Sequence, residues 1–303
     1  MLYNKRVAVL GGDMRQVSLA RYFSDKGHTV CEWGLPPSLL VGDVAVSESW
    51  QGAIKDAGLI VLPLPASPDS KHLNLPLLKD EREKPPRVAD IVCEMPRDAL
   101  LAGGRISPML KEIISGAGVR FFDYFESELL QQKNAIPTAE GAVEVLMHQI
   151  PRTVRDLPVA ITGFGRVAQA LAALLLAMGA KVTVAARKTS ALELAAKMGC
   201  DTVHIDGKGA LSALGQGYAA IFNTVPYWLF DESVLRELSK ETLLIDLSSA
   251  PGGVDANAAA ALGIRVIFAL SLPGKYAPQT AGEIIAETIL SHIEEEQQGV
   301  RGL

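Results

Sequence analysis

Short apolar runs alternate with stretches of helical spacing along most of the chain. Runs such as 6–10 and 159–162 end at glycine, and the segments that follow them carry apolar residues three or four positions apart. Strands that alternate with helices in this way form parallel sheets covered by helices. The pattern therefore predicts an α/β protein.

The same pattern gives approximate positions for the elements. In the first half we expect strands at 6–10, 28–32, 59–62, 89–93 and 119–122, with helices at 13–26 and 109–115. In the second half we expect strands at 159–162, 181–185, 220–223, 242–247 and 265–268, and a last helix at 281–296. The polar, proline-rich segment 67–87 is typical of a long loop.

Length and pattern together predict two doubly wound parallel-sheet domains. Residues 138–149 have helical spacing and separate the halves of the 303-residue chain. We expect a substrate-type domain at 1–135 and a dinucleotide-binding Rossmann domain at 136–280, with the terminal helix 281–303 packing back on the first. Clefts between domains are common ligand sites, so we expect one here.

The second domain opens with a nucleotide-binding fingerprint. After a strand comes G-x-G-x-x-A, formed by Gly163, Phe164, Gly165, Arg166, Val167 and Ala168. The first glycine allows a tight turn, the second lets pyrophosphate approach the backbone, and the small third residue lets helix and strand pack closely. The alternative is a purely structural turn.

Two bases stand where such a domain more often has an acid. Arg187 and Lys188 follow shortly after the strand expected at 181–185. An acid there accepts from the ribose 2′-hydroxyl of NAD, whereas a guanidinium forms charge-assisted bonds to the 2′-phosphate of NADP. We therefore favour NADP, with NAD as the alternative. The alternative is that the two bases are solvated surface residues that do not discriminate between nucleotides.

Further turns are candidates for lining a ligand. The segment after the strand at 220–223 is predicted to lie near the nicotinamide, and includes Asn223, Thr224, Val225 and Pro226. The residues predicted to bind substrate are Gly12, Asp13, Arg15, Thr138, Pro251, Gly252, Gly253, Pro273 and Gly274. Each of these turns also has a plain structural explanation.

The candidate catalytic residues are two carboxylates, Glu140 and Asp13. Asp13 and Gln16 have the spacing of a capping box at a helix start, and Arg15 beside them is suited to a carboxylate ligand. Glu140 and Thr138 are expected at the beginning of the helix that joins the domains, where an acid favours the helix dipole.

Charge and cysteine content exclude several classes of protein. The formal net charge of −5 gives no bulk attraction to nucleic acid or to an anionic membrane, and the apolar stretch 168–179 is too short to span a bilayer. Three widely spaced cysteines form no disulfide framework, which suggests the cytoplasm. The five histidines lack metal-ligand spacing, so we predict no metal site.

Taken together, the motifs resemble the A subunits of dipicolinate synthase from spore-forming bacteria. The matching stretches are collinear: "VAVLGGDMRQ", "AIPTAEGA", "GFGRVAQALA", "VTVAARK", "NTVP", "LIDLSSAPGGVD" and "LPGKYAPQTAGEI". In the family a base can precede Pro-Gly-Gly where this chain has Ala250. If that base holds substrate, Arg15 or Lys275 is expected to replace it.

The resemblance implies a fold arranged as in D-2-hydroxyacid dehydrogenases. It implies NAD(P)-dependent conversion of dihydrodipicolinate, formed from 4-hydroxy-tetrahydrodipicolinate, to dipicolinate in the mother-cell cytoplasm during sporulation. It also implies a partner, the flavoprotein-like B subunit of dipicolinate synthase, and a small dicarboxylate substrate. Whether the chain forms a homo-oligomer stays open.

Two other functions fit parts of the sequence. A D-2-hydroxyacid dehydrogenase needs a histidine paired with a carboxylate in its cofactor domain. After Gly165 the chain has only His204 and His292, and neither is well placed for that role. A non-catalytic protein that binds a nucleotide and positions substrate or partner is the second alternative, because the sequence offers no obvious base.

Overall fold

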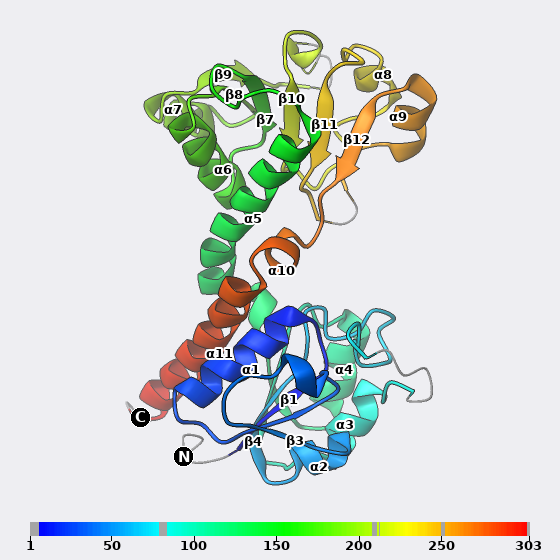
Figure 1. Cartoon of the computed structure of the whole chain (residues 1–303), viewed down its shortest axis with the longest axis vertical. Helices are drawn as coiled ribbons and strands as arrows, with labels where there is room; N and C mark the ends of the chain where they lie inside the picture. The colour runs from blue at the N-terminus through cyan, green and yellow to red at the C-terminus, as the bar shows by residue number, and fades with distance from the viewer. Residues whose placement is uncertain (1–5, 79–83, 208–210, 212, 250–251, 302–303) are drawn as a thin grey trace. The chain divides into compact units, whose positions relative to one another are not determined.

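The chain forms two compact units, each built on one six-stranded parallel sheet (Figure 1). Unit 1 comprises Met1–Asn134 and Ala277–Leu303, and unit 2 comprises Ala135–Tyr276. The structure is a computed structural model that describes residues 6–78, 84–207, 211, 213–249 and 252–301. The predicted fold class, two doubly wound parallel sheets, is confirmed.

Unit 1 has the strand order β3-β2-β1-β4-β5-β6. Its strands are β1 (Arg6–Leu10), β2 (Val30–Trp33), β3 (Val44–Val46), β4 (Ala57–Val61), β5 (Leu100–Gly103) and β6 (Arg120–Asp123). Its helices are α1 (Met14–Asp25), α2 (Trp50–Ile54), α3 (Val88–Glu94), α4 (Pro108–Gly116), the 3-10 turns η2 (Pro37–Leu39) and η3 (Tyr124–Glu126), and α11 (Pro278–Arg301).

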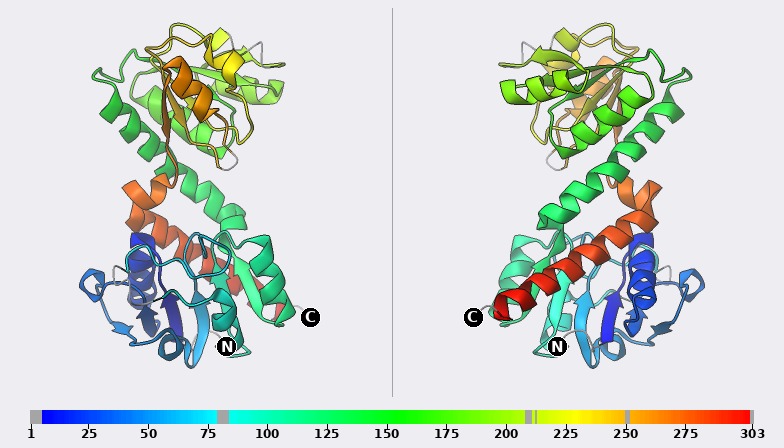
Figure 2. Two further views of the ribbon diagram at one scale, coloured as in Figure 1. Left: turned by 90° about the vertical axis from the view of Figure 1, so that its right-hand side faces the viewer. Right: turned by 90° about the vertical axis from the view of Figure 1, so that its left-hand side faces the viewer.

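Alternating residues of the unit 1 strands enter two hydrophobic cores. On β1, Val7 and Val9 pack with the residues of α1 and α11, whereas Ala8 and Leu10 pack with those of α2, α3 and α4. Successive side chains of a strand point to opposite faces, so an all-apolar strand must be covered on both sides. Figure 2 shows α1 and α11 side by side on one of these faces.

Unit 2 has the strand order β12-β11-β10-β7-β8-β9. Its strands are β7 (Pro158–Thr162), β8 (Lys181–Ala186), β9 (Asp201–His204), β10 (Ala220–Asn223), β11 (Leu243–Asp246) and β12 (Arg265–Phe268). Its helices are α6 (Arg166–Ala177), α7 (Thr189–Lys197), α8 (Glu232–Leu235), α9 (Ala256–Leu262), α10 (Leu272–Tyr276) and most of α5 (Glu128–Gln149).

Both faces of the unit 2 sheet are also covered. One core joins alternate strand residues such as Val159 and Phe222 with α5, α6 and α7, and the other joins Ala160 and Ile221 with α8 and α9.

In the described parts of the chain no helix is both long enough and apolar enough to cross a bilayer.

One predicted strand is wrong, because residues 89–93 belong to the helix α3. Val88, Ile91 and Val92 are its buried residues. Positions i, i+3 and i+4 lie on one helical face, so this short apolar run has the helical period, and it packs beside α4.

The position predicted for Thr138 and Glu140 is also wrong. The helix that holds them, α5, begins at Glu128 and continues through Pro137, so both residues lie well inside it. The proline suggested a helix start because it lacks an N–H. Buried Leu130 and Ala135 continue the apolar pattern toward the N-terminus and extend the helix. The helix dipole therefore gives no reason for an acid at position 140.

Candidate functional site

The strand order of the unit 2 sheet reverses at β7, the point at which doubly wound sheets form their binding crevice. β7 pairs with β8 on one side and with β10 on the other, so the turns after β7 and β10 diverge at the carboxyl edge. In doubly wound sheets ligands bind at this point. The predicted nucleotide residues follow β7, β8 and β10, and the fold brings them to the same edge of the sheet.

The three small residues of the fingerprint have different surroundings. Gly163 has φ +82°, and a Cβ there would lie 2.7 Å from Val225 Cγ2 and 2.9 Å from Thr224 Oγ1. At Gly165 a Cβ would meet no atom within 4 Å. Ala168 is fully buried. The first glycine is required by the fold, the second leaves open space for a ligand, and the alanine packs helix against sheet.

The N-terminus of α6 is suited to an anion. Its N-cap is Gly165, which has no side chain to bond the first N–H groups of the helix. These N–H groups and the helix dipole attract phosphate. By contrast, the Asp13 carboxylate caps α1. The two helix starts therefore differ, and α6 is the one whose donors suit a pyrophosphate.

Arg187 and Lys188 follow β8 and are exposed. The Arg187 carbonyl accepts from His204 Nε2 at 3.0 Å, which ties the end of β8 to the end of β9. The backbone is thus held within the sheet while the guanidinium stays in solvent. A cation in this position is available to a 2′-phosphate of a nucleotide in the crevice.

Asn223 lies beneath the predicted nicotinamide edge. It is fully buried, its Nδ2 donates to Asp246 Oδ1 at 2.9 Å, and its Oδ1 accepts from Thr162 Oγ1 at 2.7 Å. Thr224 and Val225 are half-buried and Pro226 is exposed. The residues after Asn223 can therefore face a ligand, while Asn223 itself supports them from below.

The predicted substrate turn of unit 1 follows β1, at the reversal point of the first sheet. The capping box is present: the Asp13 carboxylate accepts from Arg15 N, and Gln16 Oε1 accepts from Asp13 N. Gly12 N donates to Asn74 O at 3.0 Å and so joins this turn to the segment after β4.

Arg15 is buried in this turn with 7% of its surface exposed. Its Nε and one terminal nitrogen bond the Asp13 carboxylate at 2.9 and 2.7 Å, and the same nitrogen bonds Leu64 O. A fork-shaped pair of this kind is strong and directional. Much of the guanidinium is therefore used within the protein, and the Asp13 side chain keeps 32% exposure.

The other predicted substrate residues are spread over different elements. Glu140 is exposed on α5, where Thr138 is half-buried. Pro273 and Gly274 lie in α10, whose Leu272 and Tyr276 pack against α5 at Gly141. Gly252 and Gly253 follow β11, whereas Ala250 and Pro251 lie outside the described residues.

Sequence reasoning missed three acids, Glu32, Asp69 and Asp246. Burial raises the pKa of Glu32 to about 7, with part of the rise offset by the Leu35 N–H. A hydrogen bond from His72 lowers the pKa of Asp69, whose Oδ2 lies 2.7 Å from His72 Nδ1. Asp246 and Glu32 each had a signal in the sequence, because each is a carboxylate at or near the end of a predicted strand.

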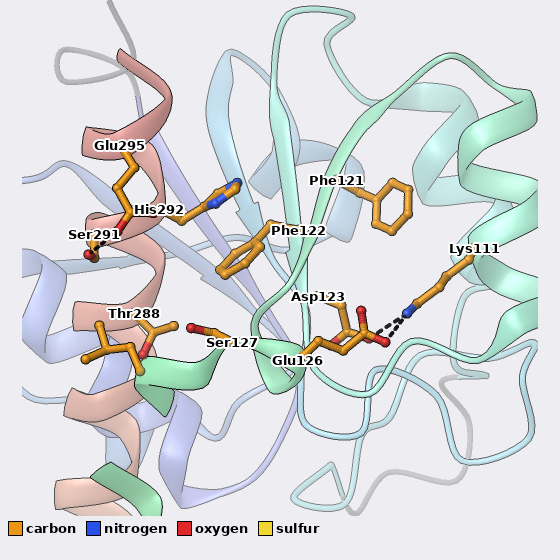
Figure 3. Close-up of a pocket in the computed structure, with 11 residues that line it drawn as sticks. Lys111, Phe121, Phe122, Asp123, Glu126, Ser127, Thr288, Ser291, His292 and Glu295 are labelled. Carbon is orange, nitrogen blue, oxygen red and sulfur yellow. Dashed lines mark hydrogen bonds and ion pairs between the residues drawn. The ribbon is translucent and has the colours of Figure 1, made fainter. Parts of the chain in front are cut away.

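A separate hollow of about 510 Å³ lies in unit 1 between β6, η3 and α11 (Figure 3). The rings of Phe122 and His292 stack in it with centroids 3.8 Å apart. Lys111 Nζ pairs with Glu126 at 2.6 Å and lies 3.5 Å from Asp123. These charged groups pair with one another within the protein, so we assign no ligand to this hollow.

The chain is similar to known proteins in both units. Residues 6–125 match the family of N-terminal domains from the A subunits of dipicolinate synthase, and residues 158–250 match the family described as "NADP oxidoreductase coenzyme F420-dependent". The dipicolinate synthase A chain of Bacillus subtilis (strain 168) is 28% identical over the full length of both proteins.

Solved structures agree with this similarity. The corresponding dipicolinate synthase chain from Bacillus halodurans superposes with a TM-score of 0.86 at 27% identity, covering 96% of this chain and 98% of that one. An L-alanine dehydrogenase, at 16% identity and a TM-score of 0.66 over 98% and 91% of the chains, shares the fold. The family matches support an oxidoreductase-type protein that uses a nicotinamide dinucleotide.

Proposed function

The chain belongs to the family of dipicolinate synthase A subunits, and from that premise we propose that it oxidises dihydrodipicolinate to dipicolinate with NADP. The substrate derives from 4-hydroxy-tetrahydrodipicolinate and loses one hydride and one proton as its ring becomes aromatic. We propose further that the chain acts with a B subunit in the mother-cell cytoplasm of a sporulating bacterium.

One observation carries the proposal: the turn after β7 has the features that suit a pyrophosphate. The space beside Gly165 is open, and the α6 N-terminus has no side-chain cap. When bound, the nicotinamide supplies the hydride acceptor. The residues of the chain hold the phosphates at this turn and place Thr224, Val225 and Pro226 toward the other end of the dinucleotide.

The preference for NADP rests on Arg187. Its exposed guanidinium follows β8, where an acid would favour NAD. Lys188 adds a second positive charge beside it. We therefore propose NADP as the cofactor and Arg187 as the residue that bonds its 2′-phosphate.

The proton requires a base, and the two candidates differ. Glu140 is an exposed carboxylate on α5, free of the helix-start role expected for it. The Asp13 carboxylate binds Arg15 and the α1 N-terminus. We propose Glu140 and Asp13 as the two possible proton acceptors, and we propose that Asp13 also orients Arg15, which with Gly12 forms the polar end of the substrate turn. Gly252, Gly253, Pro273, Gly274 and Thr138 remain proposed substrate contacts.

The test is direct. The product of the dihydrodipicolinate-forming enzyme is supplied with NADP or NAD to the purified chain, with and without a B subunit, and dipicolinate is followed by its ultraviolet absorbance. We expect dipicolinate with NADP. If none forms with either nucleotide, whether or not the partner is present, the proposal is wrong. Turnover only in the presence of the partner would assign this chain a supporting part in a shared reaction.

A further inference from the structure

The strand β11 ends at Asp246, whose carboxylate is almost completely buried. Asp246 is 1% exposed. Its Oδ1 accepts from Asn223 Nδ2 at 2.9 Å and from the Oγ and N of Ser248 at 2.7 and 3.1 Å, and its Oδ2 accepts from Gly253 N at 3.2 Å. All four donors are neutral. One carboxylate thus holds both described ends of the loop after β11.

The neighbouring amide has a matching set of bonds. Asn223 Nδ2 donates to Val225 O as well as to Asp246, and its Oδ1 accepts from Val225 N and from Thr162 Oγ1. Only an amide both donates and accepts in this way, and only a carboxylate offers two acceptor oxygens. Exchanging the residue types at 223 and 246 would therefore keep a hydrogen bond between the two positions but lose the donation to Val225 O.

We call Thr162, Asn223, Asp246, Ser248 and Gly253 the carboxyl-edge brace. Thr162, Asn223 and Asp246 are register neighbours at the ends of β7, β10 and β11. A Cβ at Gly253 would overlap Asn223 Nδ2 and lie 2.9 Å from Val225 O. The two loops are in close contact, so a movement of one moves the other.

The brace also reaches the nucleotide turn. Thr224 Oγ1 donates to Thr162 O at 2.8 Å, and Thr224 and Val225 are the residues that a Cβ at Gly163 would meet. The turns after β7, β10 and β11 are thus tied together below the surface of the crevice. The brace lies under the exposed backbone that faces the proposed nicotinamide site.

We propose that Asp246 is a positioning residue that sets the nicotinamide end of the bound dinucleotide. This inference rests on the proposed nucleotide function. Asp246 is too buried to touch a ligand itself: it bonds Gly253 directly, and it holds Asn223, from which Thr224–Pro226 continue. It fixes these segments against each other, and they orient the nicotinamide. The adenosine and pyrophosphate contacts at Gly165 and Arg187 do not depend on it.

The test compares the two ends of the dinucleotide in Asp246→Asn. An amide there has one acceptor oxygen, so its NH₂ must face either the Gly253 N–H or the Asn223 NH₂, and donor meets donor. NADPH is titrated into each protein. The affinity for NADPH reflects the contacts of the whole dinucleotide, whereas the fluorescence emission of the bound nicotinamide reflects the surroundings of the nicotinamide end alone. We expect affinity within about threefold of the unmodified protein, and loss of the emission change.

Turnover gives a second readout, in which we expect kcat to fall about tenfold or more while the affinity for NADP is kept. Asp255→Asn is the matched control, since Asp255 caps α9 in the same unit by accepting from Ala258 N and asparagine caps as well. It should behave as the unmodified protein. Ser248→Ala, which removes one donor from Oδ1, should have a smaller effect than Asp246→Asn.

A swapped pair tests the brace itself. Asn223→Asp alone places two carboxylates in contact and should lose the emission change. Combining it with Asp246→Asn restores one donor between the two positions, so the double variant should recover part of the change. Thermal unfolding is measured for every variant.

Two results would overturn the inference: an Asp246→Asn protein with unmodified emission and kcat, or one whose affinity, emission and unfolding midpoint all fall in parallel, as general loss of fold would cause. No NADPH binding by the unmodified chain would instead defeat the proposed function, and the inference with it. Binding without dipicolinate formation leaves the emission test of the brace intact.

Discussion

At the scale of single residues, the proposed choice of NADP over NAD rests on Arg187. Replacing it by aspartate removes a guanidinium and places a repelling carboxylate beside the 2′-phosphate. We expect Arg187→Asp to weaken NADP by about tenfold or more, since bonds to charged groups contribute about 1.5–3 kcal/mol. NAD should weaken much less. Titration of both nucleotides checks this, with Lys188→Ala as the milder control, and equal weakening of the two would show that Arg187 does not bind the 2′-phosphate.

A substitution at Gly165 distinguishes an effect on nucleotide binding from an effect on folding. Its φ of −81° suits any residue, and a Cβ there meets no atom within 4 Å. Gly165→Val should therefore keep the fold to within about 0.5 kcal/mol and abolish nucleotide binding, because the side chain occupies the path of the pyrophosphate. Thermal unfolding and NADPH titration measure the two effects. Gly116, at the end of α4, also has open space around it, so Gly116→Val should leave nucleotide binding intact. Tight binding by a folded Gly165→Val protein would make the turn merely structural.

Glu32 makes the stability of unit 1 depend on pH. Its pKa rises from 4.5 to about 7 on folding because of burial, so the folded state holds the proton longer than the unfolded chain. The contribution of Glu32 to the free energy of unfolding is therefore fully present below the pKa of the unfolded chain. It is lost as pH rises from 4.5 to about 7. The loss is roughly 3 kcal/mol at most, from about 1.4 kcal/mol per pKa unit.

Glu32→Gln removes this loss. Glutamine nearly matches the shape of the protonated acid, so the variant should resemble the unmodified protein at pH 5 and be more stable at pH 8. Denaturant unfolding of both proteins at both pH values gives the difference between their free energies of unfolding. The other titrating groups contribute equally to the two proteins and cancel in this difference. A difference that stays constant with pH would contradict the raised pKa.

Side-chain pairing marks the limit of what the sequence predicts at this scale. The capping box at Asp13 and Gln16 was predicted and is confirmed, because it depends on local spacing. The burial of Arg15 was not foreseen: its bond to Leu64 O joins residues 49 positions apart. The outward-facing arginine assumed for a ligand is instead largely committed to Asp13.

At the scale of elements, periodicity predicted most central strands and failed where it was brief. The runs at 6–10 and 220–223 are strands as expected. The run at 89–93 is a helix, since its buried residues have the period of a helix and five residues give too few turns to show it. The short strands β3, β5 and β9 were missed. The largely exposed residues of β3 and β9 lack an apolar signal, and the four buried residues of β5 are too few to show a period.

The contact between α1 and α11 gives an element-scale prediction. A Cβ at Gly282 would overlap Arg15 O and lie 2.8 Å from Ser18 Cβ. Glycine to alanine inside a helix usually stabilises by up to about 1 kcal/mol. Here it should destabilise unit 1 by about 1–3 kcal/mol, because α11 must move away from α1. Thermal unfolding of Gly282→Ala measures this, and Gly116→Ala, with open space around it, serves as control. Equal behaviour of the two would argue against close helix packing.

At the scale of the whole molecule, the chain leaves unit 1 at Asn134 and returns to it at Ala277. Unit 1 is therefore complete only after unit 2 has been made. Its core shows this, because Ile284, Ile285 and Ile289 on α11 pack in the same cluster as Phe23 on α1. Unit 2 is continuous in sequence and has its own two cores.

This connectivity predicts that the two units differ in their dependence on the C-terminus. Ending the chain at Tyr276 removes α11 and exposes the α1 face of unit 1, including the fully buried Phe23. Loss of several large core residues, at about 2–5 kcal/mol each, exceeds the stability of a typical domain. We expect the shortened protein to lose the unfolding transition of unit 1 and to retain NADPH binding by unit 2. Calorimetry with and without NADPH measures both, because a ligand raises the midpoint only of the unit that binds it. If nucleotide binding disappeared with α11, the proposed cofactor site would require unit 1 as well.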